Sequence, residues 1–279
     1  MSKWLVTTDW LAQHLQDTNL RIVDIRGKVL PATEPPPHYY SHRDDYLLSH
    51  IPGAVFVDWT TDIVEPGSPS YDIANPDRYA ALMSELGIGD DTFVVAYDDA
   101  QGMFAARMWW TLRYYGHDSV AVLDGGWQKW LAENHPVTDQ IPARRRATFT
   151  PRLNSALNAT AADIRREQPM LLDVRSPQEF AGEASRATRK GRIPGSVNVP
   201  RKQMLREDGR LLEADQLRGK FQAAGLDLSN PGIVTYCNSG VSASFALLAL
   251  EQIGIESASV YDGSWKDWAN NLENPVNSE

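Results

Sequence analysis

The sequence predicts an α/β protein of two tandem domains, each a mainly parallel sheet flanked by helices. Four short motifs recur in the same order in the two halves, and apolar β-branched runs alternate with helical stretches such as 76–86 and 161–168. A segment rich in Pro, Arg, Thr and Asn separates the halves. We therefore expect a first domain at residues 1–135, a linker at 136–157 and a second domain at 158–279.

The recurring motifs define the repeat unit. Each half has an apolar strand ending in Asp-x-Arg, an Ile-Pro-Gly turn, a strand–loop–helix unit, and an Asp-Gly-Gly-Trp or Asp-Gly-Ser-Trp turn with a second Trp three residues later. Corresponding residues are 149 positions apart at Asp24 and Asp173, and 138 positions apart at Trp127 and Trp265. Differing loop lengths produce such a gradual change in a duplicated domain. We expect the tryptophans to pack in the core and Asp173 to support the fold together with Arg175.

The only cysteine, Cys237, follows a buried-strand pattern at 233–236 and precedes an apolar helix pattern that begins near Ser242. The carboxyl edge of an open α/β sheet is where ligands bind. Backbone amides from Asn238 to Ser242 and the amino end of the helix favour an anionic sulfur, and the thiolate is the nucleophilic form of cysteine. A lone cysteine is otherwise often a small buried hydrophobic residue. The strand–loop–helix context favours the nucleophile.

The first half has an aspartate, Asp98, at the position that Cys237 holds in the second half. A carboxylate cannot perform thiol chemistry, so we expect the first domain to be non-catalytic. Its expected role is to form one wall of a cleft between the domains.

Composition excludes several classes of function. The net charge of −9, from 27 basic and 36 acidic residues, is unsuited to general nucleic-acid binding, and the basic run 144–146 is expected in a solvated linker. The chain has no apolar run of about 18 residues, and its amino terminus lacks the apolar core of a secretion signal. We therefore expect no membrane partner. A single cysteine fits a reducing compartment, so the cytoplasm is the expected location.

The ordered motifs and the loop Cys-Asn-Ser-Gly-Val-Ser resemble the tandem-domain rhodanese family of sulfurtransferases over essentially the whole chain. The resemblance implies that Cys237 takes sulfur from a small anionic donor, becomes a persulfide and passes the sulfur to a thiol or to cyanide. A thioredoxin-like protein is one candidate acceptor. This covalent mechanism requires no metal and no cofactor, and it gives ping-pong kinetics. The loop residues that would hold the sulfur and the donor are Asn238, Gly240, Val241 and Ser242.

The family uses two donors, 3-mercaptopyruvate and thiosulfate, and the neutral loop of this chain resembles the mercaptopyruvate type. The resemblance implies that Ser239 then works with His50, the histidine of His-Ile-Pro-Gly in the first domain, as a proton relay. The acidic residue that orients the histidine is left open among Asp44, Asp45 and Asp58. Mercaptopyruvate is the favoured donor, and thiosulfate is the alternative.

The chain departs from the mercaptopyruvate type at residues 178–181, where Gln-Glu-Phe-Ala replaces a Gly-Arg-Phe-Arg stretch. Another cation must then bind the anionic end of the donor. The candidates lie on the loop that follows, at Arg186, Arg189, Lys190 and Arg192.

Three functions of other classes fit the sequence less well. The chain could be a non-catalytic module that binds a partner or a sulfur carrier, but the intact cysteine loop argues against this. A cysteine phosphatase needs a cationic clamp for phosphate, whereas 238–244 contains no cation. A redox sensor is disfavoured because no second cysteine exists to resolve an oxidised Cys237.

Overall fold

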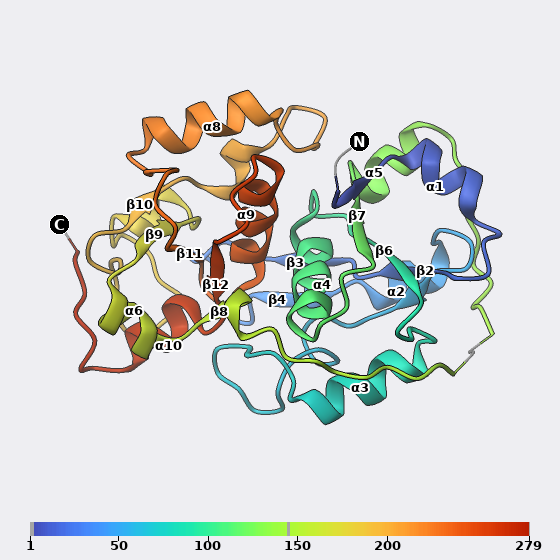
Figure 1. Ribbon diagram of the computed structural model, residues 1–279, viewed down its shortest axis with the longest axis horizontal. Coiled ribbons are helices and arrows are strands. Elements are labelled where there is room, and N and C mark those ends of the chain that lie inside the picture. Colours follow the sequence, from blue (N-terminus) through green and yellow to red (C-terminus); the bar gives the residue numbers. More distant parts are fainter. Residues whose placement is uncertain (1–2, 144–145, 279) are drawn as a thin grey trace.

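The computed structural model describes residues 3–143 and 146–278 and contains two α/β units (Figure 1). The first unit consists of β1 (Leu5–Val6), α1 (Thr8–His14), β2 (Leu20–Asp24), β3 (Gly27–Val29), β4 (Tyr39–Ser41), α2 (Arg43–Leu48), β5 (Val55–Phe56), α3 (Pro76–Glu85), β6 (Phe93–Tyr97), α4 (Met103–Tyr114), β7 (Val120–Leu123) and α5 (Gly126–Ala132). The second unit consists of η1 (Ser155–Leu157), β8 (Asn158–Ala159), α6 (Ala161–Glu167), β9 (Met170–Asp173), α7 (Pro177–Phe180), β10 (Val197–Asn198), η2 (Arg201–Met204), α8 (Ala214–Ala223), β11 (Ile233–Tyr236), α9 (Val241–Gln252), β12 (Ser259–Tyr261) and α10 (Ser264–Asn270).

The two five-stranded sheets have the same topology. The first sheet has the strand order β1-β7-β6-β2-β5, and the second has the order β10-β9-β11-β12-β8, which is the same arrangement counted from the opposite edge. All pairings within these two sheets are parallel. Parallel strands require crossover connections, and a helix supplies most of them here. The predicted α/β fold with two tandem domains is confirmed.

The two units pack against each other through α4 and α9, which lie side by side at the centre of the molecule (Figure 1). Both helices begin after a left-handed glycine, with φ of 81° at Gly102 and 73° at Gly240. Both are buried on nearly all sides, and a single hydrophobic cluster includes side chains of the two helices, such as Phe104 and Phe245. The carboxyl ends of β6 and β11, which precede these helices, therefore lie near the interface between the units.

The segment between the units runs along the first one. The backbone N–H of Ala147 donates to the Ser84 carbonyl at 3.0 Å, and that of Arg152 donates to the Tyr115 carbonyl at 2.9 Å. Phe149 is buried. Of the basic run predicted to be solvated, the Arg146 side chain is 83% exposed, whereas Arg144 and Arg145 lie outside the described residues.

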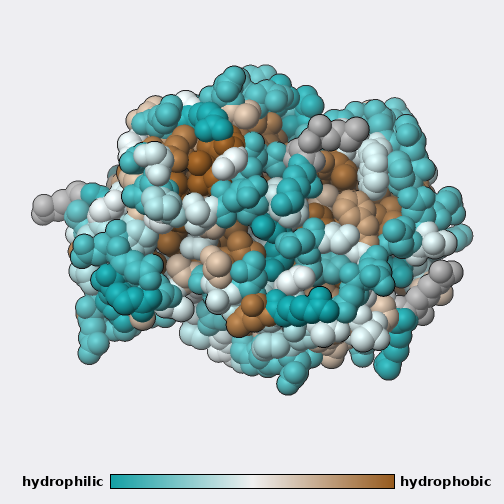
Figure 2. All heavy atoms as spheres, in the orientation of Figure 1, coloured by the Kyte–Doolittle hydropathy of each residue, from teal (hydrophilic) through white to brown (hydrophobic). Residues whose placement is uncertain are grey.

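Hydrophilic side chains cover most of the face drawn in Figure 2, and hydrophobic atoms show there only in separate patches. The longest helices among the described residues, α4 and α9, have 12 residues each, and none of the described helices could cross a bilayer.

Candidate active site

A cavity of about 670 Å³ lies between the two units and contains Cys237 in its lining. The first unit contributes Val29, Tyr39 and Met103, among other residues, and the second contributes the loop that begins at Cys237. The hydroxyl of Ser242, in the first turn of α9 directly after that loop, lies 3.2 Å from the sulfur of Met103, so the two walls meet there. The first unit therefore forms one side of the cavity, as the sequence predicts.

Cys237 lies at the carboxyl end of β11, directly before the loop that leads into α9. The residue is buried, with 5% of its surface exposed to solvent. The loop reverses direction at Gly240, whose φ of 73° favours glycine. A Cβ atom there would lie 2.6 Å from Asp262 and 2.7 Å from Arg107, so a larger residue would collide with both.

The second Asp-Gly-Ser-Trp motif holds the Cys237 loop in place. The hydroxyl oxygen of Ser264 accepts from the backbone N–H of Cys237 at 3.1 Å and of Gly240 at 3.0 Å, and it donates to the Tyr261 carbonyl. The N–H of Trp265 donates to the Cys237 carbonyl at 3.0 Å. Sequence reasoning missed Ser264, although the first motif has Gly where the second has Ser.

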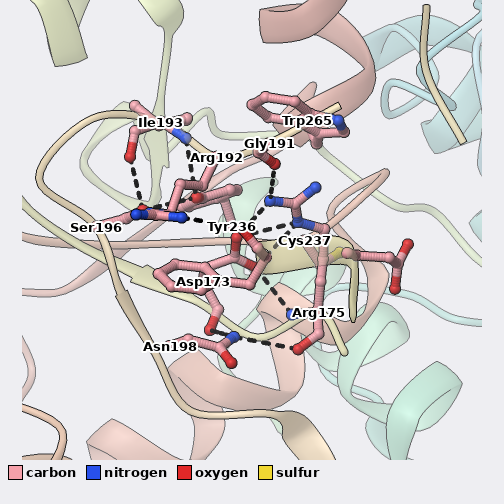
Figure 3. Close-up of polar contacts among 12 residues, drawn as sticks. Asp173, Arg175, Gly191, Arg192, Ile193, Ser196, Asn198, Tyr236, Cys237 and Trp265 are labelled. Atoms are coloured by element: carbon pink, nitrogen blue, oxygen red, sulfur yellow. Dashed lines mark hydrogen bonds and ion pairs between the residues drawn. The ribbon is translucent and has the colours of Figure 1, made fainter. Parts of the chain in front are cut away.

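A buried ion pair between Asp173 and Arg175 lies close to the Cys237 loop and supports it (Figure 3). Arg175 donates to Asp173 at 2.6 Å and to the Gly191 carbonyl at 2.9 Å, and its guanidinium lies over the ring of Trp265. Tyr236, directly before Cys237, donates to Ser196 at 3.0 Å. These contacts agree with the prediction that Asp173 and Arg175 support the fold.

Arg186 lies in the cavity lining and is paired with a carboxylate. Its guanidinium contacts Glu179 at 2.6 Å, and it also donates to the Leu30 carbonyl of the first unit. The same Glu179 oxygen accepts from the side-chain amide of Asn238 at 2.9 Å. Glu179, for which no role was predicted, therefore connects a predicted donor-binding cation to the active-site loop.

The other predicted cations lie elsewhere, which corrects that part of the prediction. Arg189 donates to the carbonyls of Trp268, Ala269, Asn271 and Asn274, so it anchors the carboxyl-terminal segment. Arg192 lies over the ring of Phe180, and Lys190 donates to the Glu183 carbonyl. None of these three is among the described residues that line the cavity.

Two cations that the sequence analysis did not select, Arg201 and Lys202, do line the cavity. They begin η2, which starts shortly after the carboxyl end of β10, and so lie at the same sheet edge as Cys237. Burial lowers the pKa of Arg201, and the charge of Asp98 opposes that effect. Their position shortly after the strand that follows the second Ile-Pro-Gly motif could have indicated that they reach this sheet edge.

His50 lies outside the cavity, which corrects the predicted proton relay. It is fully buried, and its ring stacks on Tyr46. Its Nδ1 lies 2.7 Å from the Tyr46 carbonyl and its Nε2 lies 3.2 Å from the Gln140 carbonyl, so backbone oxygens engage both ring nitrogens. The imidazole holds the segment after α2 against the segment at Gln140. None of the three candidate orienting aspartates, Asp44, Asp45 and Asp58, bonds to it.

Ser239 instead lies near a tyrosine. The hydroxyls of Ser239 and Tyr39 are 3.4 Å apart across the interface between the units. Burial raises the pKa of Tyr39 to about 12, partly offset by its contact with Ser239, so the phenol stays protonated at neutral pH. Tyr39 reaches the cavity because the antiparallel hairpin of β3 and β4 extends from the first unit. No motif marks this hairpin position, so sequence patterns alone could not identify the residue.

Comparison with known proteins decides the family. The model of the rhodanese-like domain matches residues 7–133 and again residues 157–271. This chain belongs to the rhodanese family. A 3-mercaptopyruvate sulfurtransferase from Escherichia coli strain K12 is 30% identical, with 98% of this chain and 97% of the relative aligned. A thiosulfate sulfurtransferase from Bos taurus is 35% identical over 95% of this chain and 91% of the relative.

Further relatives agree on the fold and differ in their names. The sulfur carrier protein TtuD from Thermus thermophilus is 32% identical over 98% of this chain and 95% of its own. The crystal structure of SseA from Escherichia coli, described as a 3-mercaptopyruvate sulfotransferase, matches with a TM-score of 0.83 and 31% identity. That match covers 94% of this chain and 98% of the other. The chain is thus an enzyme of the sulfurtransferase class with two rhodanese domains.

The two rhodanese domains differ at the end of the central strand. Asp98 is fully buried, and each of its carboxylate oxygens accepts two backbone N–H groups of the loop and the first turn of α4. The donors are Ala100, Gly102, Phe104 and Ala105, at 2.7–2.9 Å. The fold therefore presents converging amides to a negative group at this position. In the second rhodanese domain, Cys237 stands at the corresponding place.

A potential cation cluster lies outside the cavity. Among the described residues, ligand atoms of Asp9, Glu133 and His135 lie close enough together to share an ion. Glu133 already accepts from Lys129 and Thr8, so protein groups satisfy its carboxylate.

Proposed function

We propose that this enzyme moves sulfane sulfur from a small anionic donor, preferably 3-mercaptopyruvate, through a persulfide on Cys237 to a thiol or to cyanide. The observation that carries the proposal is the position of Cys237. It lies in the lining of a cavity enclosed by both domains, at a site where the equivalent loop of the first domain directs four N–H groups at a carboxylate. The N–H group of Gly240 donates to Ser264, so the other amides of the Cys237 loop are the ones we expect to stabilise an anionic sulfur.

The reaction has two displacements. The Cys237 thiolate attacks the sulfur of mercaptopyruvate and forms a sulfur–sulfur bond. The carbon–sulfur bond breaks, and its electron pair leaves as the enolate of pyruvate, which then takes up a proton. An acceptor thiolate or cyanide attacks the outer sulfur and releases the Cys237 thiolate. With thiosulfate, the donor's sulfur–sulfur bond breaks instead and sulfite leaves with the electron pair.

The hydroxyls of Ser239 and Tyr39 support mercaptopyruvate as the donor. A departing enolate develops negative charge on oxygen, and a nearby O–H group stabilises that charge or protonates the product. Both hydroxyls belong to cavity-lining residues, and the phenol of Tyr39, whose pKa burial raises to about 12, is protonated at neutral pH. Tyr39 takes the place that the sequence analysis gave to His50.

The anionic end of the donor has three candidate partners, Arg186, Arg201 and Lys202, which line the cavity. Glu179 partly neutralises the charge of Arg186, so Arg201 and Lys202 attract the anionic donor more strongly. These cations also favour thiosulfate, a dianion, and thiosulfate is the second candidate donor. A thioredoxin-like protein remains a candidate acceptor. The similarity to the sulfur carrier protein TtuD suggests that the same persulfide could also serve as a sulfur carrier.

The assignment of the two domains is part of the proposal. The domain at 1–135 is non-catalytic because Asp98 occupies the sulfur position, the segment 136–157 is the linker, and the domain at 158–279 carries Cys237. A single cysteine and a net charge of −9 favour a cytoplasmic enzyme that binds no nucleic acid.

Steady-state transfer to cyanide from each donor tests the choice. We expect higher kcat/KM with mercaptopyruvate, and we expect Ser239→Ala and Tyr39→Phe each to lower that value by about 10²-fold while changing the thiosulfate rate less than about threefold. Tyr40→Phe is the matched control, because the Tyr40 hydroxyl donates to the Pro37 carbonyl and the residue does not line the cavity.

Three results would count against this account. Faster turnover with thiosulfate would reverse the order of the donors. Equal losses with both donors would mean that the two hydroxyls do not act on an enolate. No transfer from either donor, in folded protein with a free thiol, would favour the non-catalytic binding module.

A further inference from the structure

Lys266 places an ammonium group beside the active-site loop from outside that loop. It belongs to the first turn of α10, and its backbone N–H donates to the Asn238 carbonyl at 3.2 Å. Its side chain extends to the first domain, where Nζ lies 4.3 Å from the ring centroid of Tyr39 and 4.5 Å from that of Tyr71. One residue thus contacts both the loop after Cys237 and the tyrosine opposite Ser239.

The charge of Lys266 has aromatic partners but no acidic one. In the part of the chain that the structure describes, no carboxylate lies within ion-pair distance of its Nζ. Arg186, the other cation that acts electrostatically on this group, is neutralised by Glu179 at 2.6 Å. The ring faces of Tyr39 and Tyr71 offset only part of the free-energy cost of burying half of this ammonium group.

The loop itself holds no cation from Asn238 to Ser244. Nevertheless Cys237 must be anionic as the attacking thiolate, and it becomes anionic again when the acceptor takes the sulfur. The charged and titratable groups that face Lys266 are Tyr39, Tyr71, Arg186 and Cys237. Of the two cations in this set, Lys266 is the one without a carboxylate partner among the described residues.

We infer that Lys266 supplies the positive charge that stabilises the anionic sulfur of Cys237, and that it also fixes the ring of Tyr39 opposite Ser239. Lys266 is therefore a positioning residue, which acts on the sulfur through the electric field of its ammonium group and on Ser239 through Tyr39. This inference deepens the proposed function, because it assigns the charge on which the Cys237 chemistry depends.

The charge state of Lys266 predicts a pH dependence. Burial, together with the charge of Arg186, lowers the pKa of Lys266 to about 8, and an anionic Cys237 offsets part of that lowering. The ammonium is charged below pH 8 and loses its proton as the pH rises through 8. The stabilisation of the sulfur anion is therefore present at neutral pH and declines above pH 8. An arginine at this position keeps its charge throughout this range.

The test is the rate of Cys237 alkylation by iodoacetamide as a function of pH in the full chain, which contains one cysteine. Lys266→Met retains the length of the apolar stem and removes the charge. We expect it to slow alkylation at pH 7 by about tenfold and to raise the pH of half-maximal rate by about one unit. Lys266→Arg should stay within about twofold of the wild type. Lys190→Met, which changes a lysine whose ammonium donates to the Glu183 carbonyl, should match the wild type.

Two outcomes would overturn the inference. The first is a wild-type pH profile in Lys266→Met. The second is equal slowing in Lys266→Met and Lys266→Arg, because the side chain would then act by packing and not by charge. Alkylation needs neither donor nor acceptor, so the assay separates this inference from the proposed function. Normal alkylation shifts without any sulfur transfer would overturn the proposed function alone.

Discussion

Replacement of Cys237 by serine is expected to lower sulfur transfer to cyanide by at least about 10³-fold with either donor. Serine has nearly the same shape as cysteine, so it preserves the loop that Ser264 and Gly240 hold. However, a hydroxyl is not ionised at neutral pH and cannot accept a sulfane sulfur to form a persulfide. The measurement is kcat/KM for thiocyanate formation from mercaptopyruvate and from thiosulfate.

Stability measurements on the same variant separate chemistry from folding. Cys237 is buried in a loop whose backbone contacts do not involve its sulfur, so we expect the free energy of unfolding to change by no more than about 1 kcal/mol. A Cys237→Ser protein that retains more than a few per cent of wild-type activity would place the nucleophile elsewhere.

The largest effect on stability is expected from Arg107→Ala. Arg107 of α4 donates to Asp262 of the second domain at 2.5 Å, and the exposed fractions of the two side chains are 2% and 7%. The second oxygen of Asp262 accepts the N–H of Ile73 at 2.8 Å. Truncation leaves a buried carboxylate without its cation, which typically costs about 3–5 kcal/mol. The Arg107–Asp262 pair also packs directly behind Gly240. Urea unfolding measures the lost free energy of unfolding.

An exposed ion pair provides the control for Arg107→Ala. Arg152 pairs with Asp90 at 3.8 Å, and its side chain is 71% exposed, so Arg152→Ala should cost less than about 1 kcal/mol. The double variant Arg107→Met with Asp262→Leu should recover part of the loss, because no buried charge then remains unpaired. A loss for Arg107→Ala as small as that for Arg152→Ala would refute a stabilising role for this contact.

The fold and the position of Cys237 were predictable because short local patterns determine them. Apolar strands followed by helices determine parallel sheets, and the change from Asp98 to Cys237 is visible between the two repeats. The Cys237 loop is likewise local, since a strand end, small residues and a helix start specify it within a few positions.

The partners of Cys237 were less predictable, because tertiary packing selects them. A guanidinium binds carbonyls as readily as an anionic ligand, so the sequence alone could not tell that Arg189 anchors the carboxyl-terminal segment while Arg201 reaches the cavity. The motif around His50 predicts a functional histidine, but the ring is buried against Tyr46 and Gln140 and lies outside the cavity. Tyr39 comes from a hairpin of the other domain, at a distance of 200 residues from Ser239.

The most direct test of the central claim is the intact mass of the protein after addition of donor and removal of the excess. The proposal predicts that wild-type enzyme gains the mass of one sulfur atom, that peptide mapping places it on Cys237, and that cyanide removes it. Sulfur transfer by an enzyme that never gains this mass, or a gain on a residue other than Cys237, would contradict the persulfide mechanism.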